Sequence, residues 1–284
     1  MIHCLQSAAK LNLSLRVLGR RNDGYHELRS LFYALPSVES LTIEPVYGHN
    51  VKSEIYVSGE AVRGRNILED VLSAAGRRGD APALRIRLHK VLPPGSGLGG
   101  GSGNAGALIS WLNAFLCKGR EIAGEEVGSD VPFFVKGERW ALVGGRGERV
   151  EPLGRDMPSL RTLVVVPSWS ISTARAFSLL SAKFRSGFPL KEAEAEAERR
   201  EVLEQLAEGR ILGLLPNDFC AVLLEERPEY SDLFGLLRDS GAIAWGITGS
   251  GSAAFGLYPE GRGFPGSVQA GCRMRWIRKI LYLE

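Results

Sequence analysis

The chain has 284 residues, of which 44% are hydrophobic and 24% are charged, and these proportions exclude a disordered, collagen-like or low-complexity protein. Thirty-five lysines and arginines against 32 acidic residues leave a net charge of +3, which is too small to indicate a nucleic-acid binder. The length is typical of two domains or of one large domain.

The sequence has four scattered cysteines: Cys4, Cys117, Cys220 and Cys272. They form no CxxC pair, and the four histidines have no metal-binding spacing, so we expect neither a protein-held metal nor a disulfide framework. Glycines interrupt both long uncharged stretches, whereas a membrane span needs about 20 predominantly apolar residues. The N-terminus has no pattern of a secretory signal. We therefore expect a cytoplasmic protein with no membrane partner.

The first third of the chain is patterned as β-strands. Apolar residues alternate with polar ones over 11–17, which places Lys10, Asn12 and Ser14 together on the face opposite the core. Similar alternation predicts strands over 41–46, 51–57 and 84–92. Between these strands, Asn66 is expected to cap a helix that runs to about Arg78.

Within this region the segment DGYHELRSLF, residues 23–32, places an aromatic ring and an imidazole beside a turn. Tyr25 and His26 could stack on a nucleobase and hydrogen-bond its edge. Ordinary packing is the commoner role of such a pair, so the segment alone leaves both readings open.

The strongest local signal is the glycine-rich run PPGSGLGGGSG at 93–103, followed by an apolar segment over 105–117 that is typical of a buried helix. Glycines let the backbone approach a phosphate closely, and the N–H groups at a helix start attract anions. A tightly turned connector is the alternative, but six glycines in eleven residues favour an anion site. The run lacks a Walker A ending, and no second strand follows it as a dinucleotide fold requires.

The segment GSDVPFFV, residues 128–135, places Asp130 among apolar residues. Such a carboxylate can act as a general base if a cation keeps it ionised, and Lys10 is a candidate for that cation. The alternative is that Asp130 or Ser129 only caps a helix, and this segment taken alone slightly favours capping.

The second half predicts strands over 139–143 and 162–166, with a proline- and glycine-containing domain boundary at 151–159. A solvated helix is expected over 191–209, supported by pairs such as Glu196 with Arg200. Residues 242–259 predict two short strands joined by a glycine turn, which either supports a ligand or only turns a hairpin. A last strand is expected over 273–283.

Taken in order, the segments AAKLNLSL, DGYHELRSLF, PPGSGLGGGSGNAG, GSDVPFFV and TGSGSAAFG resemble the motifs of the GHMP family of small-molecule kinases. The resemblance implies an α+β fold, with a domain like ribosomal protein S5 domain 2 over 1–152 and a ferredoxin-like domain over 153–284. It implies ATP and Mg²⁺ as cofactors. The DGYHEL segment further implies that the acceptor is cytidine diphosphate-linked methylerythritol, an intermediate of the non-mevalonate route to isoprenoid precursors.

The resemblance also implies roles for single residues. Lys10 and Asp130 match the catalytic pair, which reverses the preference for a capping role. The positions that match substrate-binding residues are Asn12, Tyr25, His26, Phe177, Thr248 and Gly249. The positions that match the phosphate loop are Pro93, Pro94, Gly95, Ser96, Gly97, Leu98, Gly99, Gly100, Gly101, Ser102 and Gly103.

Two features depart from the family pattern. Gly103 stands where the family usually has serine, and the segment 118–127 is shorter than usual. Two other functions stay open: a GHMP kinase for homoserine, mevalonate or a sugar, and a non-catalytic nucleotide-binding module. We expect a small-molecule substrate, no nucleic-acid partner, and a monomer or homodimer.

Overall fold

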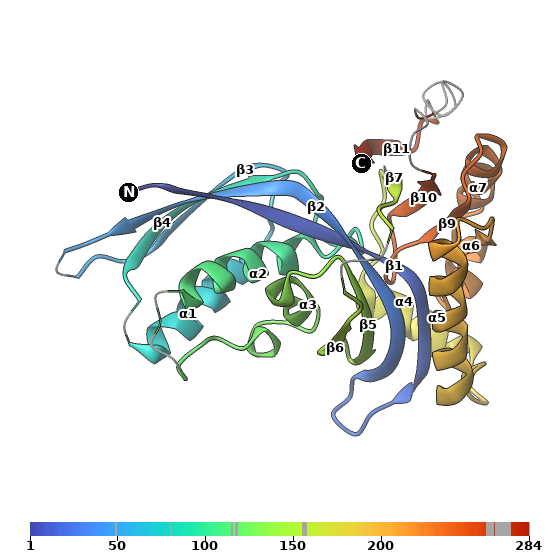
Figure 1. Cartoon of the computed structure of the whole chain (residues 1–284), viewed down its shortest axis with the longest axis horizontal. Helices are drawn as coiled ribbons and strands as arrows, with labels where there is room; N and C mark the ends of the chain where they lie inside the picture. Colours follow the sequence, from blue (N-terminus) through green and yellow to red (C-terminus); the bar gives the residue numbers. More distant parts are fainter. Residues whose placement is uncertain are drawn as a thin grey trace.

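Two β-sheets organise the chain, the first built from its N-terminal half and the second from its C-terminal half (Figure 1). The structure is a computed structural model that describes residues 1–48, 50–79, 81–114, 116, 119–154, 158–259, 264 and 274–283. Cys117, Cys272 and the middle of the predicted domain boundary, 155–157, lie outside these residues, as does residue 118 of the shortened segment.

The first sheet has six strands in the described part of the chain: β1 (His3–Arg20), β2 (His26–Val46), β3 (Glu54–Gly59), β4 (Ala83–Lys90), β5 (Trp140–Gly145) and β6 (Arg149–Pro152). Their order is β3-β4-β2-β5-β6, and β1 pairs with β2 in a long antiparallel ribbon. The alternation predicted over 11–17 is therefore the middle of a longer strand. Lys10 lies inside β1, opposite Ala34, and not ahead of it as the pattern suggested.

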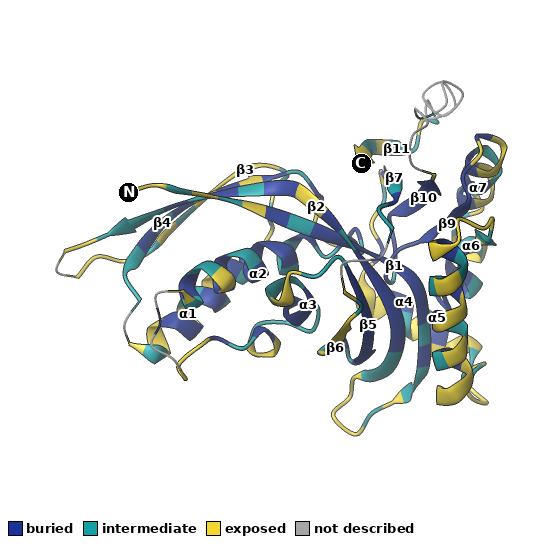
Figure 2. Ribbon diagram, viewed as in Figure 1, coloured by how far each residue is buried: buried dark blue, intermediate teal, exposed yellow. Residues whose placement is uncertain are grey.

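The helices of this half pack on one side of the first sheet (Figure 1): α1 (Ile67–Arg78), α2 (Gly100–Asn113) and α3 (Val131–Lys136), with a 3-10 turn at Gly124–Glu126. The predicted start of α1 is confirmed, because the side chain of Asn66 accepts from the N–H of Leu68 and Glu69 accepts from the N–H of Asn66. The apolar sequence of α2 is explained by its burial against α1 and the sheet (Figure 2). α2 begins in the glycine run itself, five residues before the predicted 105.

The second sheet has five strands among the described residues: β7 (Arg161–Pro167), β8 (Gly213–Leu214), β9 (Ala244–Ile247), β10 (Ala254–Tyr258) and β11 (Ile277–Leu283). Their order is β11-β7-β10-β9-β8. The predicted hairpin over 242–259 is confirmed as the antiparallel pair β9 and β10. The helices of this half are α4 (Thr173–Lys183), α5 (Glu192–Ala207), α6 (Cys220–Glu226) and α7 (Glu229–Asp239).

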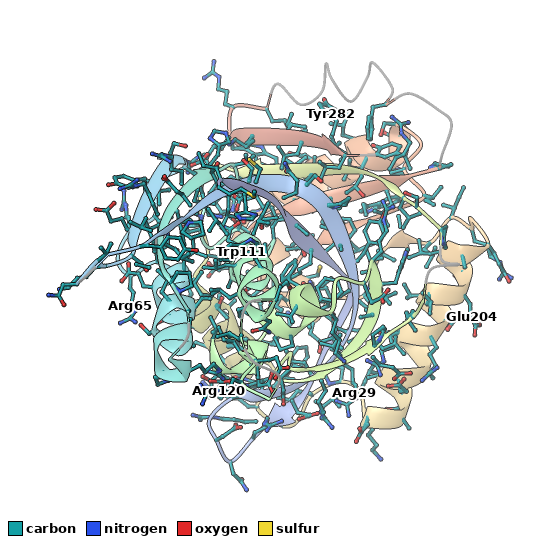
Figure 3. All side chains as sticks on the ribbon, turned by 60° about the vertical axis from the view of Figure 1, so that its left-hand side comes forward. Arg29, Arg65, Trp111, Arg120, Glu204 and Tyr282 are labelled. Carbon is teal, nitrogen blue, oxygen red and sulfur yellow. The ribbon has the colours of Figure 1, made fainter. Side chains whose placement is uncertain are left out.

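The charged helix α5 is solvated on one side only. Glu204 lies on its outer side (Figure 3), and Arg200 pairs with Glu196 as predicted. On the inner side Val202 is buried, and Glu198 pairs with Arg16 of β1 at 2.7 Å. α5 therefore fastens the second half of the chain to the first, a role that the charge pattern did not predict.

The two sheets share part of their core. One buried cluster contains Leu11 and Leu31 of the first sheet together with Val164 and Phe255 of the second. Continuous burial of this kind fixes the sheets relative to each other, so that groups from both can line one site. None of the helices in the described ranges is long and apolar enough to cross a membrane.

Candidate active site

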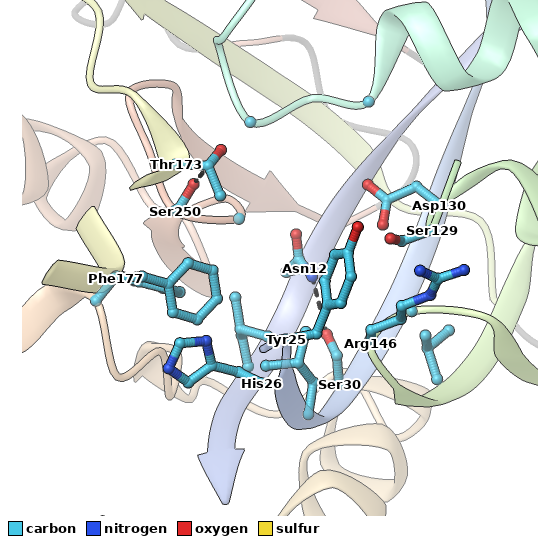
Figure 4. A pocket seen from close by; sticks show the side chains of 18 of the residues that line it. Asn12, Tyr25, His26, Ser30, Ser129, Asp130, Arg146, Thr173, Phe177 and Ser250 are labelled. Carbon is cyan, nitrogen blue, oxygen red and sulfur yellow. Dashed lines mark hydrogen bonds between the residues drawn. The ribbon is translucent and has the colours of Figure 1, made fainter. Parts of the chain in front are cut away.

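A cavity of about 660 Å³ lies where the two halves of the chain meet (Figure 4). Its walls come from β1, β2, the glycine run, the segment ahead of α3, the turn between β5 and β6, and the start of α4. The predicted site residues that line it are Lys10, Asn12, Tyr25, His26, Gly97, Gly99, Ser102, Asp130, Phe177 and Gly249. Segments that are far apart in the sequence thus converge on one space.

Lys10 and Asp130 form the charged centre of this cavity. Lys10 is buried, and its Nζ atom lies 3.8 Å from Oδ2 of Asp130 and 2.9 Å from the carbonyl oxygen of Gly97, to which it donates. Burial lowers the pKa of Lys10, and the negative charge of Asp130 opposes this shift. Asp130 stands at the N-cap position of α3 but accepts no capping hydrogen bond there. The structure therefore shows no capping bond from Asp130, and the carboxylate lines the cavity.

Asn12 is held in place by residues from both halves of the chain. Its Oδ1 accepts from Lys10, and its Nδ2 donates to the hydroxyl of Ser30 at 2.9 Å. Its backbone N–H donates to Oγ1 of Thr248 at 3.0 Å. Thr248 is fully buried and lies behind Asn12, so it supports the cavity wall without forming part of its lining. Gly249, the next residue, does line the cavity.

The glycine run packs tightly over β1. The N–H of Lys10 donates to the carbonyl of Leu98 at 2.8 Å, and Leu98 is buried. Gly97 has a φ of +81°, and a Cβ atom on it would lie 2.3 Å from the carbonyl oxygen of Thr248. Only glycine fits this approach. Gly99, the N-cap of α2, and Ser102 in its first turn line the cavity beside Lys10, so the helix start, whose first N–H groups have no partner within the helix, borders the cavity.

The residues of the predicted phosphate loop do not all line the same cavity. Gly97, Gly99 and Ser102 line the main cavity. Pro93, Pro94 and Ser96 line a separate cavity of about 340 Å³, together with residues of the β3–α1 connection and of the second sheet. Gly100 is buried, and Gly103 packs against the backbone of Ala8. Neither set of lining residues includes Gly95 or Gly101.

The start of the glycine run is braced by a buried ion pair that sequence reasoning missed. Both carboxylate oxygens of Glu39, on β2, accept from Nζ of Lys90, at 2.8 and 2.7 Å. The same carboxylate accepts from the backbone N–H groups of Val91 and Leu92. No local pattern could have revealed this pair, because its residues come from two separate strands.

Three aromatic residues, Tyr25, His26 and Phe177, line the main cavity. The ring of His26 stacks on that of Phe177, with centroids 4.3 Å apart and planes inclined by 15°. Tyr25 is half exposed, and the guanidinium of Arg146 lies 4.8 Å from the centre of its ring. Burial, and secondarily the charge of Arg20, lowers the pKa of His26. A neutral imidazole offers one donor and one acceptor, which suits the polar edge of a nucleobase.

The cavity is also lined by five polar residues that the sequence analysis did not predict as site residues: Ser30, Ser129, Arg146, Thr173 and Ser250. Arg146 lies in the turn between β5 and β6, within the sequence GGRGE. An arginine between glycines is a possible signal for a ligand contact. Only the fold shows that Arg146 in this turn contacts Tyr25. Ser250 donates to Thr173 at 3.2 Å in the cavity wall (Figure 4).

The oxygen atoms on the cavity wall suit a metal ion that binds together with a phosphate-containing ligand. No group of three or more acidic, histidine or cysteine side chains that could hold a metal occurs among the described residues. Ser102 and Asp130 place a hydroxyl and a carboxylate on the cavity wall. Mg²⁺ is often bound by one or two protein oxygens together with substrate phosphates and water, and these two residues fit that mode.

Two family models match the chain: GHMP kinases N terminal domain over residues 65–138, and GHMP kinases C terminal over residues 193–263. The chain is similar to the 4-diphosphocytidyl-2-C-methyl-D-erythritol kinase of Thermotoga maritima, at 37% identity over 265 residues, which are 91% of this chain and 93% of that relative. The enzyme of the same name from Solibacter usitatus is 34% identical over 272 residues, 90% of this chain and 81% of the relative.

Solved structures give the same picture. A crystal structure of 4-(cytidine 5'-diphospho)-2C-methyl-D-erythritol kinase has a TM-score of 0.73 and 31% identity, and the match covers 100% of this chain and 98% of that one. The homoserine kinase of Cytophaga hutchinsonii has a TM-score of 0.68 at 15% identity, covering 100% and 94%. At that identity the likeness concerns the fold alone. The expected mixed α+β fold is confirmed.

Proposed function

Because the chain belongs to the GHMP kinase family, we propose that it transfers the γ-phosphoryl group of ATP to the 2-hydroxyl group of 4-diphosphocytidyl-2-C-methyl-D-erythritol, a step of the non-mevalonate route to isoprenoid precursors. The observation that carries this proposal is a shared cavity. Tyr25, His26 and Phe177 line the same cavity as Lys10 and Asp130.

In the proposed reaction Asp130 accepts the proton of the acceptor hydroxyl. The oxygen of that hydroxyl forms a bond to the γ-phosphorus, the bond from the γ-phosphorus to the bridging oxygen breaks, and ADP leaves. Lys10, whose Nζ atom lies 3.8 Å from Asp130, offsets negative charge on the transferring group. Asn12, which is fixed by Ser30 and Thr248, holds the methylerythritol part. Phosphoryl transfer needs little beyond such positioning and charge stabilisation.

For the nucleotide, we propose that the backbone N–H groups of the glycine run and of the first turn of α2 hold the ATP phosphates. Ser102 would hold Mg²⁺ or a phosphate oxygen, and the bound ion supplies positive charge to the phosphates.

We place the two domains at 1–152 and 153–284, because β6 ends at Pro152 and β7 begins at Arg161. We place the reaction in the cytoplasm, on a monomer or homodimer.

The proposal is tested by ADP release from Mg·ATP with the purified protein. The acceptors compared are 4-diphosphocytidyl-2-C-methyl-D-erythritol, methylerythritol phosphate, CMP, homoserine and mevalonate. Homoserine and mevalonate belong in the set because kinases named for them share this fold. We expect strong release with the first acceptor alone. Release with another acceptor would reassign the substrate, and release with none would favour a non-catalytic module.

A further inference from the structure

The cavity contains two side chains of lysine or arginine among its described lining residues, Lys10 and Arg146. Lys10 is engaged with Asp130, Asn12 and the backbone of the glycine run, at the end of the cavity where the phosphoryl group is transferred. Arg146 lies beside Ser129 and Asp130, against the ring of Tyr25 (Figure 4). The two cations therefore serve different parts of the cavity.

Arg146 has no carboxylate partner within ion-pair distance in the described ranges. Its guanidinium donates to the carbonyl oxygen of Glu125 at 3.4 Å and lies 4.8 Å from the ring centre of Tyr25. Asp23 lies within its electrostatic reach, but the Asp23 carboxylate accepts from Arg21. The charge of Arg146 thus remains available to an anion in the cavity.

The turn that carries Arg146 is held beside Asp130, the proposed general base. The N–H of Arg146 donates to the carboxylate of Glu148 at 2.7 Å, and the N–H of Gly147 donates to the carbonyl of Gly144 at 3.2 Å. A Cβ atom on Gly147 would lie 3.2 Å from Oδ1 of Asp130. The turn therefore holds Arg146 next to Asp130, with its guanidinium against Tyr25.

This inference rests on the proposed function. In the acceptor, a diphosphate group joins the cytidine to the methylerythritol that carries the reacting hydroxyl. If the cytosine lies at Tyr25 and His26 and the hydroxyl at Asp130, the diphosphate must run along the cavity from these aromatic residues to Asp130. Arg146 contacts Tyr25, and the next residue, Gly147, lies beside Asp130, so the guanidinium is within reach of that path. We propose that Arg146 binds this diphosphate. A guanidinium can donate two parallel hydrogen bonds to a phosphate, and its stacking on Tyr25 orients it beforehand.

The test measures the binding of cytidine and of CDP to the full chain by calorimetry. Charge-assisted hydrogen bonds of this kind predict that R146Q and R146A weaken CDP binding by about 10- to 100-fold and cytidine binding by less than about threefold. R146K, which keeps the charge without the planar fork, restores part of the loss. The matched control is R149Q, because Arg149 is on the same hairpin, pairs with Glu27 and lies outside the cavity. It should bind both ligands like the wild type.

The outcomes separate the inference from the function on which it rests. Equal weakening of cytidine and CDP by R146Q and R146A would mean that Arg146 acts only by holding Tyr25, and it would overturn the inference. Wild-type CDP affinity in both variants would overturn it as well, and the proposed function would stand. A wild-type protein that binds neither cytidine nor CDP would remove the proposed function itself.

Discussion

The Nζ atom of Lys10 lies 3.8 Å from Oδ2 of Asp130, and this ion pair joins the first strand of the chain to the segment ahead of α3. The two side chains differ in exposure: that of Lys10 is 5% exposed and that of Asp130 is 31% exposed. The cation is thus more deeply buried than the carboxylate, and both groups line the cavity. Positive charge is in place before a substrate arrives, so little reorganisation is needed during the reaction.

The first prediction concerns Asp130→Asn. The amide keeps the size of the side chain but cannot accept the proton of the acceptor hydroxyl, so we expect kcat to fall by about 10²- to 10⁴-fold. Binding of ATP and CDP should change by less than about threefold, because the glycine run and the aromatic residues are intact. Single-turnover kinetics and calorimetry provide the two measurements. Near-normal turnover would remove Asp130 from the mechanism.

Local signals allowed the elements of this site to be predicted. The cap at Asn66 depends on residues three positions apart, and the hairpin of β9 and β10 depends on one glycine turn. The interpretation of Asp130 shows the limit of such signals. The segment alone favoured a cap, and only the match of several motifs in order pointed to Lys10 as its partner.

Contacts between distant segments could not be predicted. Glu39 and Lys90 meet because β2 and β4 are neighbours in the sheet, and nothing in either strand specifies that pairing. Arg146 meets Tyr25 because the β5–β6 turn lies beside the turn before β2. α5 was expected to be a surface helix because its sequence is charged. Its buried Val202 and its ion pair from Glu198 to Arg16 become evident only when the two halves are packed together.

A second prediction concerns the protonation of His26. Its pKa in the folded chain lies below the ordinary value of 6.5, mainly because of burial and secondarily because of Arg20. The imidazole is therefore neutral above pH 6.5 and becomes charged only as the pH falls through the lowered value. We expect the affinity for cytidine to be constant from about pH 9 to 6.5 and to decrease in more acidic solution.

His26→Gln is the control for this titration, because its amide also donates and accepts but does not ionise in this range. Its affinity for cytidine should stay level where that of the wild type decreases, when both are measured by calorimetry across the same buffers. A wild-type transition above pH 6.5 would contradict the assigned direction of the shift.

The third prediction compares two glycines of α2. A Cβ atom on Gly103 would lie 1.9 Å from the carbonyl oxygen of Ala8, whereas one on Gly101 would meet nothing closer than Ile67, at 3.8 Å. Gly103→Ala must displace β1 or α2, so we expect a loss of about 1–3 kcal/mol in the free energy of unfolding. Gly101→Ala should be neutral or stabilise the helix by up to about 1 kcal/mol.

Urea denaturation of the two variants checks this difference. The comparison also concerns Gly103 as a departure from the family pattern, in which serine is usual at this position. A large loss in Gly103→Ala would show that the close approach of Ala8 requires glycine here. Equal stability of the two variants would show that the strand can move away at little cost.

The last prediction concerns Glu39, whose buried carboxylate accepts four hydrogen bonds at the start of the glycine run. Glu39→Ala leaves the ammonium of Lys90 buried without its partner, and such a change costs about 3–5 kcal/mol. We expect this loss in urea denaturation, with a higher KM for ATP because the run loses its brace. Glu44→Ala is the matched control on the same strand, since its pair with Arg85 is partly solvent-exposed and is worth at most about 1 kcal/mol. If Glu39→Ala destabilised the chain and left the KM for ATP unchanged, the ion pair would support only the sheet and would have no part in shaping the phosphate loop.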